Sequence, residues 1–175
     1  MASIQNKINP MRDLRIEKVV INIGVGKSGE ALERAESVLE ELFNKKPHKR
    51  KAKKSIRDFG VHQGEAIGVL VTLRHKAALD SLKNLLYAKE NKLPASSFDD
   101  AGNCSFGIKE HIEIPGVKYN PEFGIIGMNV SILMTRPGYR VKRRKLLPSK
   151  IGHKHLVTKE EAIEFLKNSL KIEVV

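Results

Sequence analysis

The chain has 175 residues, of which 41% are hydrophobic and 30% are charged, and its formal net charge at pH 7 is +12. This length and composition predict one folded domain with a substantial core. No apolar stretch approaches the roughly 20 residues that span a bilayer, and the first residues lack the apolar segment of a secretory signal. The single cysteine, Cys104, excludes an internal disulfide and suits a reducing compartment. We therefore expect a soluble, cytoplasmic protein without a membrane partner, with a polar leader at residues 1–13 and one domain at residues 14–175.

The positive charge is concentrated in two segments. The first basic segment, residues 45–57, holds 8 of the 32 Lys and Arg residues, and the second, residues 136–155, holds another 8; neither contains an acidic residue. The rest of the chain carries 16 basic and 20 acidic residues and is mildly acidic. Clustered cations repel one another, and a polyanion relieves this repulsion and releases its own counterions on binding. Nucleic acid is therefore the leading partner, with a solvated charged face or a basic localisation signal as the alternative.

Hydrophobic periodicity divides the chain into strands and helices. In chain order we expect a strand at 14–23, a helix at 29–44, a strand at 66–74, a helix at 76–90, strands at 106–114 and 127–135, and a last helix after Thr158. Ser28 is the expected N-cap of the first helix, and Thr158 and Glu161 form a capping box for the last one. The first basic segment should form a short strand and lead into a mobile loop at 58–64. This order predicts an α+β fold, an antiparallel-rich sheet with helices on one face.

Alternation along the strands separates an apolar sheet face from a polar one, because successive side chains point to opposite faces. The apolar face should lie under the helices. The open face is expected to carry Asn22, Thr72, Arg74, Lys109, His111, Glu113, Asn129, Ser131 and Thr135. An antiparallel sheet can leave such a face in water. Beside two basic segments it also fits an RNA-binding surface. Aromatic residues make up only 5% of the chain, so recognition should rest on RNA backbone and shape rather than on base stacking.

Three glycines, Gly24, Gly26 and Gly29, form a GxGxxG pattern between a strand and a helix, which is the setting of a dinucleotide-binding turn. The acidic residue that such a turn needs about 20 positions later is missing, because that region reads KKPHKRKA. We favour a structural turn and keep a nucleotide-dependent enzyme as the alternative. The histidines lack metal-ligand spacing, and Cys104 has no adjacent base. We therefore expect no active site, metal or cofactor.

Several blocks spread over nearly the whole chain resemble one known family. They read NPMRDLRIEKVVINIGVGKSGE, AKKSIRDFGVHQGEAIGVLVTLR, LPASSFDDAGNCSFGIKEHIEIPGVKYNPEFGIIGMNV, RPGYRVKRRK and VTKEEAIEFL. From about residue 10 onward the chain is similar to the "L five" family of large-subunit ribosomal proteins, in its archaeal and eukaryotic form. The resemblance implies a non-enzymatic protein that binds 5S rRNA and helps to attach it in the central protuberance. It also implies contacts with the P-site tRNA, with a small-subunit head protein at an intersubunit bridge, and with other central-protuberance proteins.

The resemblance further implies which residues meet RNA. By motif, those at the 5S rRNA are Asn22, Lys53, Lys54, Ser55 and Thr72, to which we add the basic neighbours Lys49, Arg50, Lys51, Arg57 and Arg74. The loop expected to face tRNA consists of Phe59, Gly60, Val61, His62, Gln63 and Gly64. From charge alone we assign to large-subunit rRNA the residues Arg136, Arg140, Lys142, Arg143, Arg144 and Lys145. A third interpretation, a free-standing regulatory nucleic-acid binder, would predict tight binding away from the ribosome.

Overall fold

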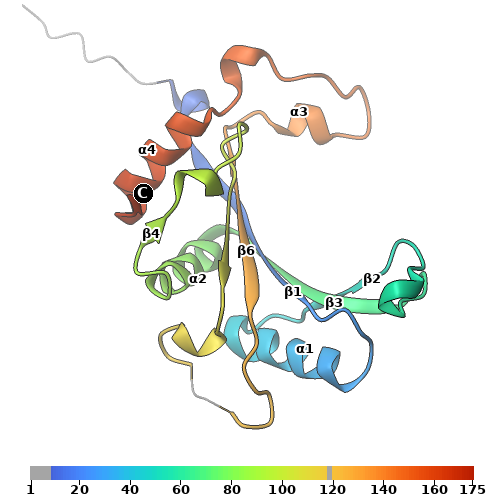
Figure 1. Ribbon diagram of the computed structural model, residues 1–175. Helices are drawn as coiled ribbons and strands as arrows, with labels where there is room; N and C mark the ends of the chain where they lie inside the picture. The colour runs from blue at the N-terminus through green and yellow to red at the C-terminus, as the bar shows by residue number, and fades with distance from the viewer. Residues whose placement is uncertain (1–8, 118–119) are drawn as a thin grey trace, which may run out of the picture.

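A computed structural model of the protein describes residues 9–117 and 120–175. It confirms the α+β class, with a five-stranded antiparallel sheet in the order β2-β3-β1-β6-β5 (Figure 1). The sheet strands are β1 (Arg15–Gly24), β2 (His48–Lys51), β3 (Ala66–Leu73), β5 (Cys104–Ile108) and β6 (Met128–Thr135), and a separate parallel pair consists of β4 (Lys92–Leu93) and β7 (Glu173–Val174). The α-helices are α1 (Glu30–Phe43), α2 (His75–Tyr87), α3 (Arg140–Arg143) and α4 (Lys159–Leu170).

Short 3-10 turns complete the described chain. They are η1 (Pro10–Arg12), η2 (Arg57–Phe59), η3 (Ala95–Ser97), η4 (His111–Glu113) and η5 (His153–His155). Of the leader expected at residues 1–13, residues 1–8 lie outside the described residues, and η1 occupies most of the remainder.

The core lies between one face of the sheet and helices α1 and α2, and buried residues of α4 extend it. The predicted alternation is confirmed in β1, β3 and β6, where every second side chain is buried. Buried strand residues include Val19, Ile21, Ile23, Val69, Val71, Leu73, Met128, Val130, Ile132 and Met134, and the helices add Leu32, Leu39, Leu82, Leu85 and Leu86. In Figure 1, α1 and α2 lie on the lower left side of the sheet. The other face is thereby left free of these two helices.

The prediction of one strand over residues 106–114 is wrong for the second half of that range. The strand β5 ends at Ile108, and the chain then turns into η4. His111 is buried, and its Nδ1 accepts a hydrogen bond from the Ile126 amide at 3.3 Å. The expectation that Lys109, His111 and Glu113 share the open face is therefore wrong. Apolar residues continue at every second position beyond Ile108, as far as Ile114. Ile114 is buried although a 3-10 turn, and not a strand, precedes it, so this pattern does not distinguish the two structures.

Two further expectations about single residues need correction. Thr135 is buried rather than open, because β6 ends there and the chain turns into the second basic segment. Ser28 does not cap α1, since the N-cap is Gly29 and the Ser28 hydroxyl instead donates to the Glu65 carboxylate. That hydrogen bond ties the turn after β1 to the residue before β3.

The last helix begins as predicted. The Glu161 amide donates to Thr158 Oγ1 at 3.4 Å, and the Thr158 amide donates to Glu161 Oε2 at 3.2 Å. The helix approaches the loop before β5 so closely that a Cβ on Gly102, at φ +73°, would lie 2.6 Å from Val157 Cγ1. Only glycine fits this contact, which fixes α4 at one end of the sheet.

Candidate nucleic-acid interface

The centre of the open face carries small polar side chains, with the partly buried apolar residues Val20 and Leu70 among them. Asn22 of β1 lies opposite Asn129 of β6, and the next row across the sheet includes Thr72, Ser131 and Ser105. The Ser105 hydroxyl donates to Ser131 Oγ at 3.1 Å. No helix in the described part of the chain packs on this centre, which faces the upper right in Figure 1. An RNA backbone can therefore approach the strands closely and meet hydroxyl and amide groups there.

Adjacent cations of the edge strand β2 point to opposite faces. Arg50 pairs with Gly68 in the register, on the open-face side, whereas Lys49 pairs with Val69, whose side chain is buried in the core. Lys49 Nζ lies 2.9 Å from Glu36 Oε2 of α1, and this hydrogen bond raises the pKa of Lys49. Of these two predicted RNA contacts, Arg50 is directed at the open face and Lys49 is already paired with an acid.

The predicted mobile loop is a hydrogen-bonded turn at the tip of the β2–β3 hairpin. Ile56 and Val61 exchange two backbone hydrogen bonds, at 2.9 and 3.1 Å, and the Gln63 amide donates to Ser55 Oγ at 2.8 Å. Val61 is buried, whereas Phe59 at the tip is 71% exposed. Ser55 thus shapes the loop, and Phe59 is the side chain that it presents outward.

A shallow apolar groove runs along this hairpin beside cations. Its apolar lining comes from Val25, Ala52, Ile56, Phe59, Val61 and Ile67. Lys27 lies on the same groove as the predicted Lys53 and Lys54. The sequence pattern does not single out Lys27 as an RNA contact, because Lys27 lies outside both basic segments. The turn after β1 is held against β3 by Val25 and Gly26, whose amides both donate to the Ile67 carbonyl, and this brings Lys27 to the site.

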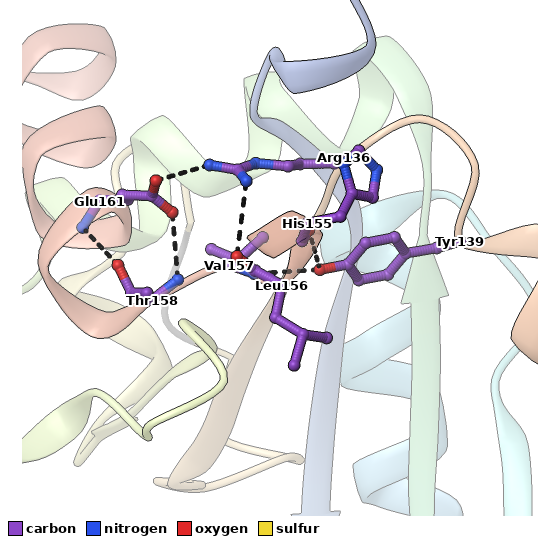
Figure 2. A network of polar contacts seen from close by, with 7 residues as sticks. All are labelled: Arg136, Tyr139, His155, Leu156, Val157, Thr158 and Glu161. Atoms are coloured by element: carbon purple, nitrogen blue, oxygen red, sulfur yellow. Dashed lines mark hydrogen bonds and ion pairs between the residues drawn. The ribbon is translucent and has the colours of Figure 1, made fainter. Parts of the chain in front are cut away.

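The second basic segment is anchored by a buried arginine (Figure 2). Arg136 is only 7% exposed, and its Nη2 donates to Glu161 Oε1 at 2.6 Å, while Nη1 donates to the Leu156 carbonyl at 3.5 Å. Burial by itself raises the pKa of Glu161, but the hydrogen bond from the Thr158 amide and the Arg136 guanidinium outweigh it and lower that pKa. Arg136, grouped by charge with the RNA-binding cations, is therefore an internal anchor.

Further contacts bring the two ends of this segment together, as Figure 2 shows. The Tyr139 hydroxyl donates to the His155 carbonyl at 3.2 Å and accepts from the Val157 amide at 3.0 Å. His155 Nε2 lies 2.8 Å from the Pro137 carbonyl oxygen. We call these contacts and the Arg136–Glu161 pair the clamp, and the residues between them, 140–154, the basic lobe. The lobe exposes all of its cations, which are Arg140, Lys142, Arg143, Arg144, Lys145, Lys150 and Lys154.

Glu17 connects the basic lobe to the sheet. It sits at an irregularity in the pairing of β1, where Arg143 Nη2 donates to Glu17 Oε2 at 2.5 Å and Arg74 Nη1 lies 3.6 Å from Oε1. The hydrogen bond from Arg143 is the main reason that the pKa of Glu17 is lowered. Two cations predicted for different RNA partners thus meet at one acid. Local sequence patterns give no sign of this, because Glu17 and Arg143 are 126 residues apart.

The structure argues against the nucleotide-enzyme interpretation. β1 pairs antiparallel with both β3 and β6, whereas a dinucleotide turn belongs to a parallel sheet. The first turn of α1 carries Glu30 and Glu33, whose charges would repel a phosphate at that helix N-terminus. Cys104 is fully buried, and burial raises the pKa of its thiol to about 12, so it is not a nucleophile.

Within residues 9–117 and 120–175, no group of three or more His, Cys, Asp and Glu side chains is placed to hold a metal ion. Among the same residues, none of the helices has the length and apolar character needed to cross a membrane.

Comparison with known proteins decides the family. Residues 9–62 match the family model described as "Ribosomal protein L5", and residues 66–165 match the model of the C-terminal part of the same ribosomal family. The chain belongs to the ribosomal protein L5 family. Three relatives named large ribosomal subunit protein uL5 come from Pyrobaculum aerophilum (54% identical over 96% of this chain and 94% of that protein), Sulfurisphaera tokodaii (51%, over 100% and 99%) and Nitrosopumilus maritimus (46%, over 97% and 98%).

The resemblance seen in the sequence blocks is thereby confirmed, including its archaeal character. This member of the L5 family is a structural constituent of the large ribosomal subunit rather than an enzyme.

Proposed function

We propose that this ribosomal protein binds 5S rRNA through the open face of its sheet and the first basic segment, and so helps to attach that RNA in the central protuberance. The observation that carries the proposal is a sheet face that no helix covers, on which short polar side chains lie among a few apolar ones and which ends in exposed cations, Arg50, Lys53 and Lys54. Lysine and arginine contacts to phosphates supply affinity, while hydroxyl and amide groups fix the position of the RNA backbone. Short side chains also allow the backbone to approach the strands.

The two projections of the molecule suggest separate roles. We assign the exposed cations of the basic lobe to large-subunit rRNA and the loop from Phe59 to Gly64 to the P-site tRNA. These projections lie at opposite ends of β1, because Glu17 near its start pairs with the lobe, whereas the residues after its end contact the hairpin (Figure 1). The proposed intersubunit bridge to the small-subunit head and the contacts with other central-protuberance proteins rest on the family resemblance.

The 5S site is tested by removing two cations. Lys53→Ala/Lys54→Ala should weaken binding to 5S rRNA and flatten the dependence of log K on log salt by roughly one unit for each phosphate that is no longer neutralised. Filter binding over a salt series, with tRNA as competitor, measures both quantities. The matched control is Lys76→Ala/Lys83→Ala, which removes the same charge from exposed positions of α2. If the two double variants have the same slope, the lysines act only through net charge and the proposed site is wrong.

A further inference from the structure

The tip of the basic lobe exposes two adjacent leucines. Leu146 and Leu147 are 80% and 82% exposed, and they line a shallow pocket with Arg140, Val141, Arg144 and Lys145. Single exposed apolar side chains are common on protein surfaces, but two adjacent leucines at the end of a projecting segment leave a contiguous apolar surface in water. Such a surface is expected to be covered by a partner.

The protein holds this tip in a defined shape. Arg144 Nε donates to the Leu147 carbonyl at 2.7 Å, and the Ser149 amide donates to the Val141 carbonyl at 3.2 Å. Leu147 adopts φ +48°, in the left-handed region that leucine rarely enters. Together with the clamp at the base of the lobe, these contacts fix the direction in which the leucines are presented.

The positive charge around the tip indicates which kind of partner would bind there. Arg143, Arg144 and Lys145 directly precede the leucines, Lys150 follows them, and the whole second basic segment contains no acidic residue. A protein partner would have to surround its apolar patch with acidic side chains to match these cations, whereas every nucleic acid offers phosphates to the cations and base faces to the leucines. Proteins that bind the minor groove of DNA insert leucine and other apolar side chains between base steps and partly unstack them, and the same contact is open to RNA bases.

We propose that Leu146 and Leu147 form an apolar wedge that inserts beside unstacked bases of ribosomal RNA, while the flanking cations of the lobe hold the phosphates. This inference rests on the proposed function, because it specifies how the lobe engages the RNA. The RNA is the large-subunit rRNA, to which the cations of the lobe are assigned above, and 5S rRNA, which presents the same chemistry, serves as the comparison.

The first test separates apolar from ionic contributions. Leu146→Ser/Leu147→Ser should leave the melting temperature unchanged and weaken binding to large-subunit rRNA about tenfold, because two apolar side chains no longer leave water on binding. The salt slope should stay the same. Lys142→Ala/Lys145→Ala should instead reduce the slope. A second variant, Leu147→Gly, suits the left-handed backbone, so it should fold at least as well as the wild type and still bind RNA more weakly.

The second test reports on stacking directly, because the chain contains no tryptophan. Leu146→Trp places a single tryptophan at the tip, and Tyr87→Trp places one on α2, where the side chain is 67% exposed; excitation at the red edge of the absorption band avoids the tyrosines. Titration with large-subunit rRNA should quench the tip fluorophore, titration with 5S rRNA should not, and the α2 fluorophore should be unaffected by both.

The outcomes are distinguishable. If the wild type binds RNA but the tip fluorophore stays solvent-exposed with both RNAs, or if the serine variant binds as the wild type does, the wedge is wrong and the proposed function stands. If the serine variant keeps its RNA affinity but loses binding to another central-protuberance protein, the occupant is a protein and the wedge is likewise overturned. If the wild type binds neither RNA, both proposals fail.

Discussion

Two neighbouring residues of β2 show how surroundings decide whether a cation is available for RNA. Lys49 is paired with Glu36 on the helix-covered side, whereas Arg50 is exposed on the open-face side. Lys49 is itself exposed, but its ion pair with Glu36 would have to be broken before its charge could neutralise a phosphate. The available charge at this edge of the sheet is therefore smaller than the count of basic residues suggests.

We accordingly predict different effects for these neighbours. Arg50→Ala should lower the affinity for 5S rRNA and reduce the salt slope by about one unit, because it removes a free cation. Lys49→Ala removes the same formal charge and should leave the slope nearly unchanged. Filter binding at several salt concentrations compares the two, and equal losses would contradict the assignment of the two side chains to opposite faces.

The clamp residue Glu161 makes stability depend on pH. Its pKa in the folded protein lies below the ordinary value of 4.5. A carboxyl group with a lowered folded pKa stabilises the fold above its unfolded pKa, and this stabilisation is lost as the pH falls through the folded pKa. Glu161→Gln should therefore melt at a lower temperature than the wild type at about pH 7, and the gap should narrow below about pH 4.5. Thermal unfolding at both ends of this range tests the prediction, and a gap that is constant with pH would show that the charge of Glu161 does not stabilise the clamp.

Among the elements, the tip of the β2–β3 hairpin combines a structural residue with an exposed one. Val61 is buried and closes the turn with Ile56, whereas Phe59 points outward. Phe59→Ala should leave the melting temperature and 5S affinity unchanged, while ribosomes reconstituted with this variant should release P-site tRNA faster. Val61→Ala should lower the melting temperature, because a buried side chain is truncated. Loss of 5S affinity in Phe59→Ala, with unaltered tRNA dissociation, would reverse the assignment of the loop.

The sequence predicts those strands and helices that have a clear hydrophobic period or a local capping motif. β1, β3, β6 and the long helices follow their hydrophobic periods, and α4 begins at its capping box because that motif needs only neighbouring residues. The end of β5 is not predictable in this way, since alternation past Ile108 fits a 3-10 turn as well as a strand. The predicted cap at Ser28 is wrong, because the Ser28 hydroxyl donates a hydrogen bond to Glu65, which is 37 residues away in the sequence.

In the molecule as a whole, charge clustering and strand alternation together predict the candidate site, but not its internal pairing. Counting charges treats Arg136 as a surface cation, whereas the fold buries it against Glu161. The convergence of Arg74 and Arg143 on Glu17 likewise depends on contacts between distant parts of the chain. Such contacts arise only once the sheet is assembled.

The position of RNA on the open face of the sheet can be measured with a tethered cleavage reagent. Cys104 is fully buried, so Ser131→Cys on the open face and Lys83→Cys on α2 each provide one accessible thiol for an iron chelate that generates hydroxyl radicals. In complexes with 5S rRNA, we predict strand cleavage from position 131 and little or none from position 83. Cleavage from position 83 with none from position 131 would show that the RNA lies on the helix-covered side instead.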